Sequence, residues 1–374
     1  MTWTFERVFY GSKDGLNLRS MRDFLMRGYY LIPHTLFNGY YRAVNRVGDY
    51  ESIYTRVKKP FPDLLLAQRP EGRFALHLSG GFDSSILAKL YDRQDVDYIH
   101  FTGPESVKAR ALAATLKGTL HEIQITPELY IEAAEEFVSR LPEPYAFEDI
   151  VYAYLASKKA KELGHTLVMS GDGGDDLFGG SDIGPYSRKA CIVWKTIDPN
   201  QLLGLTTLQP YMHTGLYAWA GSTLGPKEAG FDKVFAAQYC RQLGMPEAVC
   251  AQKKGFWAGS HGIRTNEQVL GHLAGVVDGS DYSWIKEFEF PQRPSADFPF
   301  RQYGLARWLE VNYKERLDAG EIREFSRQVR EFNAMEEKIA SALRLKETIK
   351  WYFPPAAISL GRRVRRWIRK GQTE

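Results

Sequence analysis

The chain has 374 residues, of which 44% are hydrophobic and 25% charged, the composition of an ordinary globular protein with room for about two domains. Its formal net charge is only +4, and no apolar run approaches the roughly 20 residues that a membrane-spanning helix needs. The N-terminus shows no signal-peptide pattern, so we expect a cytoplasmic protein. The three cysteines never form a CxxC pair, which argues against a disulfide framework, a zinc site and a dithiol redox centre.

The first predicted elements are a helix over about Ser20–Tyr30 and an irregular, aromatic-rich passage that reaches Tyr54. Arg73–Leu78 then alternates loosely and is rich in β-formers, which predicts a buried strand. Further strands are predicted over residues 97–102, 119–125 and 165–170, with helices through residues 86–91, 106–117, 127–140 and 150–163. Strands that alternate with helices predict an α/β fold, with a doubly wound parallel sheet flanked by helices and ligands beyond the carboxyl ends of its strands.

A loop rich in serine and glycine, Ser79-Gly80-Gly81-Phe82-Asp83-Ser84-Ser85, follows the first of these strands and opens a helix. Its glycines let the backbone approach a phosphate closely, and its hydroxyls and the N–H groups of the helix start form an anion cradle. A carboxylate at Asp83 fits such a cradle if Mg²⁺ bridges it to phosphate oxygens. The structural alternative is a turn that only caps the helix, which the spacing and the preceding strand disfavour.

A second, acidic loop, SGDGGDDLFGG, runs from Ser170 to Gly180 after another predicted strand. Its three aspartates would repel one another unless a cation or a basic side chain lies nearby. By itself the stretch could be an exposed Asp/Gly turn. Because both loops follow strands of one predicted parallel sheet, however, we expect them to meet at the same sheet edge.

The two loops resemble the signatures of a known enzyme family. The first is similar to the SGGxDSS motif of the N-type ATP pyrophosphatases, or PP-loop enzymes, and the chain lacks the Walker A pattern. The second resembles the SGDGGDELFGG motif in the synthetase domain of the asparagine synthetase family. Weaker similarities lie at residues 25–41, Glu143-Pro144, residues 252–256 and residues 307–310. The resemblance spans about Arg22 to Asn312.

The resemblance implies ATP and Mg²⁺ as cofactors, with Asp83 and Asp175 as the metal ligands. Asp172 would face the acyl substrate and the incoming amine. Lys253 would neutralise the charge that develops on the α-phosphate and pyrophosphate, with the adjacent Lys254 as the alternative. The pyrophosphate would be held by Ser79, Gly80, Gly81, Ser84 and Ser85. The adenosine pocket would be lined by Leu78, Phe101 or Thr102, Ser170 and Gly171.

The implied activity is AMP-forming amide or C–N bond formation, in which a carboxylate is adenylated and then attacked by ammonia or an amine. Asparagine synthetases of this family begin with a glutaminase domain whose nucleophile is an amino-terminal cysteine, whereas residue 2 here is threonine. We therefore expect no intrinsic glutaminase activity. The nitrogen would come from free ammonia, from an amine on the substrate, or from a separate glutaminase or carrier partner. The carboxylate would belong to a small molecule or a peptide.

After about Tyr186 the pattern becomes mostly helical, with helices predicted over residues 202–208, 231–243, 300–313 and 321–352. The expected organisation is a lead-in segment (1–70), a PP-loop synthetase domain (71–260), a helical subdomain (261–356) and a basic amphipathic tail (357–374). The last fourteen residues carry six basic side chains and one acidic one, so the tail could contact a membrane surface or an acidic partner. A frayed, solvated terminus is the alternative. The remainder is nearly neutral, so we do not expect nucleic-acid binding.

Two other functions stay open. An RNA-modifying PP-loop enzyme is favoured slightly by the basic tail but opposed by the acidic loop and the missing CxxC pairs. A non-catalytic nucleotide-binding subunit or scaffold is opposed by the intact Asp83, Asp172, Asp175 and Lys253. The sequence does not name the substrate.

Overall fold

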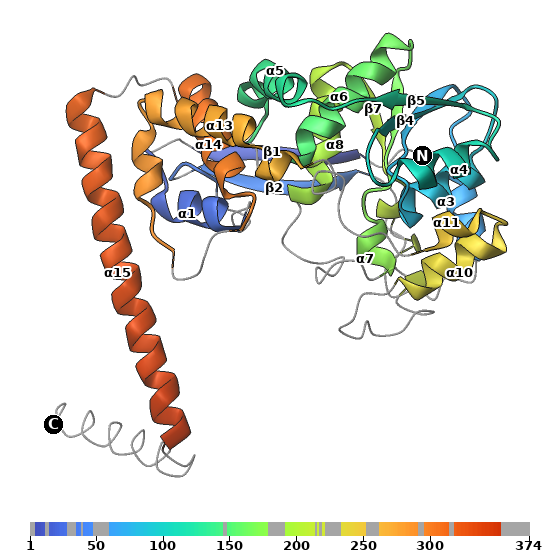
Figure 1. Ribbon diagram of the computed structural model, residues 1–374. Coiled ribbons are helices and arrows are strands. Elements are labelled where there is room, and N and C mark those ends of the chain that lie inside the picture. The colour runs from blue at the N-terminus through green and yellow to red at the C-terminus, as the bar shows by residue number, and fades with distance from the viewer. Residues whose placement is uncertain are drawn as a thin grey trace. The chain divides into compact units, whose positions relative to one another are not determined.

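The computed structural model describes residues 4–11, 15–27, 35–38, 40–47, 60–144, 148–178, 191–213, 215–216, 219–220, 233–251, 262–290, 295–313 and 318–352 (Figure 1). The chain divides into two compact units. One comprises Met1–Ser283 with Gln292–Arg316, and the other Trp284–Pro291 with Leu317–Glu374. The domain boundaries that the sequence places at residues 70, 260 and 356 stay a prediction.

The first unit is built on a five-stranded parallel sheet with the strand order β5-β4-β3-β6-β7. The strands are β3 (Phe74–His77), β4 (Val96–Phe101), β5 (Thr119–Ile123), β6 (Leu167–Met169) and β7 (Thr206–Leu208). The chain moves outward from β3 to β5, then returns to the other side of β3 and continues to β7. The order therefore reverses between β3 and β6, and the predicted doubly wound α/β fold is confirmed.

Helices cover the two faces of this sheet in two groups (Figure 1). The β3–β4 and β4–β5 connections carry α3 (Phe82–Leu90) and α4 (Ser106–Ala113), which pack with α10 (Val234–Gln242) and α11 (Glu247–Cys250). The return to β6 carries α5 (Pro127–Phe137), η1 (Val138–Arg140) and α6 (Asp149–Glu162), and α8 (Cys191–Leu202) leads to β7. Right-handed crossovers on either side of the reversal place these groups on opposite faces.

Local signals explain several of the helix starts. Pro127 is the first residue of α5, and the side chain of Thr126 caps that helix by accepting a hydrogen bond from Leu129 N. Asn266 caps α13 (Glu267–Gly279) in the same way. Such caps satisfy N–H groups that lack a partner within the helix.

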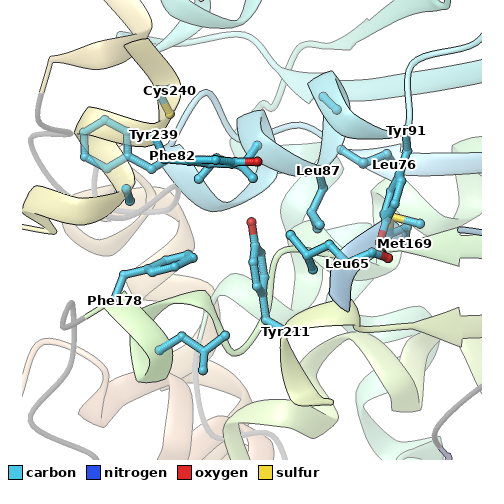
Figure 2. Close-up of a cluster of buried hydrophobic side chains, with 14 of the residues drawn as sticks. Leu65, Leu76, Phe82, Leu87, Tyr91, Met169, Phe178, Tyr211, Tyr239 and Cys240 are labelled. Atoms are coloured by element: carbon cyan, nitrogen blue, oxygen red, sulfur yellow. Dashed lines mark hydrogen bonds between the residues drawn. The ribbon is translucent and has the colours of Figure 1, made fainter. Parts of the chain in front are cut away.

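The core beneath the sheet edge is a cluster of buried apolar side chains (Figure 2). It contains Leu76 and Met169 from the sheet, Leu87 from α3, Tyr91 directly after that helix, and Tyr211 from η2 (Pro210–Met212). Phe178 enters it from α7 (Gly174–Phe178), and Phe61 from α2 (Phe61–Leu66). All four residues of β3 are buried, as expected of a strand covered on both faces.

Two elements differ from the sequence-based expectations. The helix predicted over residues 202–208 is wrong, because α8 ends at Leu202, Gly204 turns the chain at φ +73°, and Thr206–Leu208 forms β7. The passage up to Tyr54 that the sequence indicates as irregular contains β2 (Tyr40–Val47), which pairs antiparallel with β1 (Thr4–Gly11). The two misses have different causes. A strand of three residues is too short to show a period, and a strand pair depends on a partner distant in sequence.

The described elements after β7 are all helical, as predicted. The first unit adds η3 (Ile263–Thr265), α13 and α14 (Phe298–Asn312), and α1 (Leu18–Arg27) packs on α14. In the second unit Trp284 of η4 (Ser283–Glu287) stacks on Phe325 of α15 (Ala319–Tyr352), with ring centroids 5.0 Å apart. No described helix is both long enough and apolar enough to cross a membrane. The predicted basic tail, residues 357–374, lies outside the described residues.

Candidate nucleotide and metal site

The Ser/Gly-rich loop leaves the carboxyl end of β3 and is closed by its own hydroxyl groups. The Ser79 N–H donates to Ser84 Oγ at 3.1 Å, and Ser84 Oγ donates to the Gly81 carbonyl at 3.3 Å. Gly80 lies in the left-handed region at φ +79°, where an added Cβ would stand 3.1 Å from the Glu105 carbonyl oxygen. The backbone can therefore adopt this tight cradle only with glycine at that position.

The cradle opens directly into α3. Gly81 is the residue that precedes this helix, and no side chain caps it. An anion bound at this end of α3 would be favoured by the helix dipole. Ser85 is completely buried, and its hydroxyl oxygen has no hydrogen-bond partner among the described residues. This end of the loop therefore carries donors suited to phosphate oxygens.

The acidic loop leaves β6, the strand beside β3, and lies directly on the first loop. A Cβ on Gly171 would come within 3.0 Å of Ser84 N, and one on Gly174 within 2.4 Å of Asp83 Cγ. Gly173 adopts φ +89° and would collide with Met212 if it had a side chain. The glycines thus allow two polar loops to touch, and the loops meet at the same sheet edge, as the sequence predicts.

Asp83 and Asp175 converge on one ammonium group. Lys233 Nζ lies 2.6 Å from Asp83 Oδ2 and 2.5 Å from Asp175 Oδ1. Burial opposes the charge of Lys233, but the two carboxylates outweigh it and raise the pKa of this lysine. The repulsion expected among the aspartates predicts a nearby basic group but does not identify it. No local signal could, because Lys233 is 150 residues from Asp83.

The same two carboxylates fit a divalent cation. The ammonium group of Lys233 lies where both carboxylates contact one positive charge, beside the cradle of the first loop. No group of three or more His, Cys, Asp or Glu side chains that could hold a metal exists among the described residues. A magnesium ion held here would therefore need phosphate oxygens and water to complete its shell, as is common for this ion.

Asp172 is held rigidly below this pair. Its Oδ2 accepts hydrogen bonds from the hydroxyls of Ser170 at 2.9 Å and Thr196 at 2.6 Å, and from Gln209 Nε2 at 3.1 Å. Its Oδ1 lies 3.4 Å from Lys195 Nζ, which also pairs with Asp149. Three donors and a cation fix the position of this carboxylate.

The part of the chain that carries both loops is similar to a known protein family. Residues 67–243 match the family model described as asparagine synthase. Residues 67–243 form an asparagine synthase domain. Both loops, Lys233 and the sheet from β3 to β7 lie within it.

The chain is also similar to individual relatives. The chain is 34% identical over 125 residues to asparagine synthetase [glutamine-hydrolyzing] of Zea mays, covering 29% of this chain and 21% of that protein. It is 30% identical over 143 residues to asparagine synthetase [glutamine-hydrolyzing] of Sandersonia aurantiaca, covering 33% and 27%. The matched segments thus span only about a quarter of these relatives.

A solved structure, NMN synthetase from Francisella tularensis, matches at 14% identity with a TM-score of 0.32. It covers 69% of this chain and 95% of that chain. A similarity at this level says nothing about the activity of this protein.

The residues predicted to line an adenosine pocket lie at strand ends of the asparagine synthase domain. Leu78 N donates to the Ile99 carbonyl, Thr102 N to that of Ile123, and Ser170 N to that of Leu208. Phe101 is fully buried with its ring 5.0 Å from that of Tyr152, so only its backbone could face a ligand. These backbone groups and Gly171 share the sheet edge of the two loops.

Two predicted site residues lie outside the described residues. They are Lys253 and Lys254, which belong to residues 252–261. The roles given to the two lysines therefore stay predictions.

His77 is the last residue of β3, and no sequence motif gives it a role. Burial lowers the pKa of this imidazole to about 4, although the nearby Asp172 opposes the shift; Lys195 adds to it. The ring is therefore neutral at pH 7. Its Nε2 lies 3.5 Å from Ser157 Oγ on α6. His77 thus contributes to packing under the site without adding a charge.

Proposed function

We propose that the protein is an ATP- and Mg²⁺-dependent C–N ligase that activates a carboxylate as an acyl-adenylate. It would release pyrophosphate, transfer the acyl group to ammonia or an amine, and release AMP. The observation that carries the proposal is the convergence of Asp83 and Asp175 on one cation beside the cradle of Gly80 to Ser85. The asparagine synthase domain supports ATP-dependent amidation as the class of reaction.

In this proposal the first loop binds the pyrophosphate portion of ATP. Ser79, Gly81, Ser84 and Ser85 would donate hydrogen bonds to its oxygens, and Asp83 and Asp175 would hold Mg²⁺ against them. The ion would shield the charge of the departing pyrophosphate. Lys253, or Lys254, would add positive charge at the α-phosphate.

Asp172 would receive the attacking amine. Its carboxylate is fixed by Ser170, Thr196 and Gln209, so it would accept a hydrogen bond from an N–H group of the neutral amine or ammonia and leave the nitrogen lone pair free to attack. Because these donors and Lys195 hold the carboxylate in place, we assign it to orientation of the nucleophile. Holding amine and acyl-adenylate together would supply much of the rate enhancement.

We further propose that this chain does not hydrolyse glutamine. The first cysteine of the sequence is Cys191, which falls at the start of α8 within the synthase domain. The nitrogen would then come from free ammonia, from an amine-bearing substrate, or from a separate glutaminase or carrier.

The test is pyrophosphate release from Mg–ATP, screened with aspartate and other carboxylates against ammonium, amines and glutamine. Release with aspartate and ammonium would show an ammonia-dependent asparagine synthetase. Release with another pair would show a specialised amide ligase. ATP binding without release in any combination would contradict the ligase proposal and favour a nucleotide-binding subunit, and release with glutamine alone would contradict the absence of glutaminase activity.

A further inference from the structure

We propose that Lys233 is the third member of the metal site. Its ammonium group takes the place of the magnesium ion between Asp83 and Asp175 until a magnesium-bound nucleotide arrives. The side chain then moves onto the phosphates. The inference rests on the proposed function, because it concerns the same two carboxylates.

Lys233 and a metal ion exclude each other from the space between the two carboxylates. Lys233 Nζ lies within 2.6 Å of one oxygen from each carboxylate, and a magnesium ion would bind the same oxygens at about 2.0–2.1 Å. Two cations cannot share this space, since they would nearly coincide and repel each other. A metal ion can therefore enter only if the ammonium group leaves.

The ammonium group of Lys233 stabilises the two carboxylates when no metal ion is bound. Without it, Asp83 and Asp175 would place two negative charges side by side in a partly buried position, which is unfavourable. Lys233 neutralises one of these charges. A free metal ion must then compete with a resident ion pair, whereas a metal ion bound to a nucleotide also brings anions for the displaced lysine.

A displaced Lys233 needs a new partner for its charge. The side chain of Lys233 is only 14% exposed, so its charge cannot be left without a partner after displacement. The phosphate cradle of the first loop lies against Asp83, and a four-carbon stem gives an ammonium group considerable reach. Pyrophosphate oxygens in the cradle would supply the new partner.

The backbone supports a side chain with two positions. Lys233 has φ 41° and ψ 39°, and among the described residues it is the one non-glycine residue with positive φ. The left-handed region is unfavourable for a residue with a Cβ, and such strain persists where the surroundings enforce it. The two ion pairs hold Lys233 in this conformation, and their loss would let the backbone relax.

The experiment measures Mn²⁺ binding by electron paramagnetic resonance, without nucleotide and with pyrophosphate, for the full chain and for Lys233→Met. We expect the wild-type chain to bind Mn²⁺ weakly alone and tightly with pyrophosphate. The variant should bind Mn²⁺ alone at least tenfold more tightly than wild type. Its affinity for pyrophosphate in the presence of Mn²⁺ should fall at least tenfold.

The control is Lys158→Met, which removes an ion pair with Glu136 on the helical face of the sheet and should change neither affinity. Lys233→Arg keeps the positive charge and should exclude free Mn²⁺ as the wild type does. Thermal unfolding adds a second readout if Lys233→Met folds poorly: its melting temperature should recover with Mn²⁺ alone, which a purely structural lysine would not produce.

Unchanged affinity for free Mn²⁺ in Lys233→Met, together with normal pyrophosphate binding by the wild type, would overturn the inference and leave the proposed function intact. If the wild type binds neither magnesium pyrophosphate nor Mg–ATP, the proposed function fails. The proposed movement of Lys233 onto the phosphates then fails too. Binding of free Mn²⁺ still tests whether Lys233 excludes a metal ion.

Discussion

At the scale of single residues, three aspartates of similar sequence surroundings have different environments. Asp83 and Asp175 share one cation, whereas both oxygens of Asp172 are engaged by Ser170, Thr196, Gln209 and Lys195. A carboxylate paired with a single lysine can exchange that partner for a metal ion. A carboxylate enclosed by three donors keeps its place. The surroundings, and not the residue type, therefore distinguish the two carboxylates that we propose as metal ligands from the one that we propose orients the nucleophile.

Asp83→Asn should abolish the metal site while preserving its shape. We expect pyrophosphate release to fall at least a hundredfold, about 2.7 kcal/mol of lost transition-state stabilisation, because one of two metal-binding carboxylates is removed. Steady-state pyrophosphate release and Mn²⁺ binding are the measurements. Asp95→Asn, which breaks an exposed pair with Arg93, is the matched control and should retain full activity. Unchanged release by Asp83→Asn would exclude this residue as a metal ligand.

His77 should make the protein sensitive to mild acid. Burial lowers the pKa of its imidazole from 6.5 to about 4, so between these values the unfolded chain binds a proton that the folded protein refuses. The stability that His77 contributes is complete above pH 6.5 and is lost as the pH falls toward 4. The loss amounts to about 3 kcal/mol from a shift of this size. Urea unfolding of wild type and His77→Gln between pH 7.5 and 4.5 measures it.

The difference between the two pH slopes is the diagnostic quantity, because any constant cost of the glutamine cancels. The wild-type free energy of unfolding should decline more steeply than that of the variant. Parallel slopes would show that His77 titrates normally in the folded protein.

At the scale of elements, the site depends on two loops that touch through glycine. Gly171 and Gly174 of the acidic loop approach Ser84 and Asp83 so closely that a side chain would collide with them. The contact exists because β3 and β6 are neighbours in the sheet, with Ala75 opposite Val168 and Leu76 opposite Met169. Helix α3 and the short helix α7 then begin directly at the contact.

Gly174→Ala should weaken both the fold and the site. Its Cβ would lie 2.4 Å from Asp83 Cγ, so we expect a loss of about 1–3 kcal/mol in the free energy of unfolding and weaker binding of Mg–ATP. Urea unfolding and isothermal titration calorimetry are the measurements. Gly271→Ala in α13 meets nothing within 4 Å and should be neutral or slightly stabilising. Equal behaviour of the two variants would contradict the close packing of the loops.

At the scale of the whole molecule, the site occupies the point where the strand order reverses. Doubly wound sheets bind ligands outside the carboxyl ends of their strands at such a point. Here the reversal lies between β3 and β6, and the apolar cluster contains Leu76 from the first strand and Met169 from the second (Figure 2). Tyr211 joins the cluster to the site, since its ring packs in the core while its hydroxyl donates to the Asp83 carbonyl at 2.9 Å. Ligand binding should therefore stabilise the sheet as well as the loops.

Mg–ATP should raise the melting temperature, and chelation of the metal should remove the effect. A ligand that binds only the folded protein at about a hundredfold its Kd adds about 2.7 kcal/mol of stability. Without magnesium, ATP would bring its negative charge to Asp83 and Asp175 unshielded, so ATP with EDTA should stabilise far less. Differential scanning fluorimetry with ATP, Mg–ATP and ATP–EDTA measures this. Equal stabilisation by ATP and Mg–ATP would contradict a metal bridge at the site.

Features that depend on neighbouring residues can be predicted from the amino-acid sequence. The four strands from β3 to β6 and the helices between them follow from local periodicity, and the two loops follow from motifs whose glycines, hydroxyls and carboxylates lie within a few residues of one another. The confirmed α/β sheet and the meeting of the loops at one edge rest on these signals, because parallel strands place their carboxyl ends together.

Contacts between residues that are distant in sequence follow only from the tertiary fold. Lys233 reaches Asp83 across 150 positions, and Thr196 and Gln209 reach Asp172 across 24 and 37. Strand β7 and the β1–β2 pair likewise depend on partners far along the chain. The physical reason is the same in each case. A buried charge or an unpaired strand edge is stabilised by whichever group the fold brings to it, and the residues next to it in sequence do not indicate which group that is.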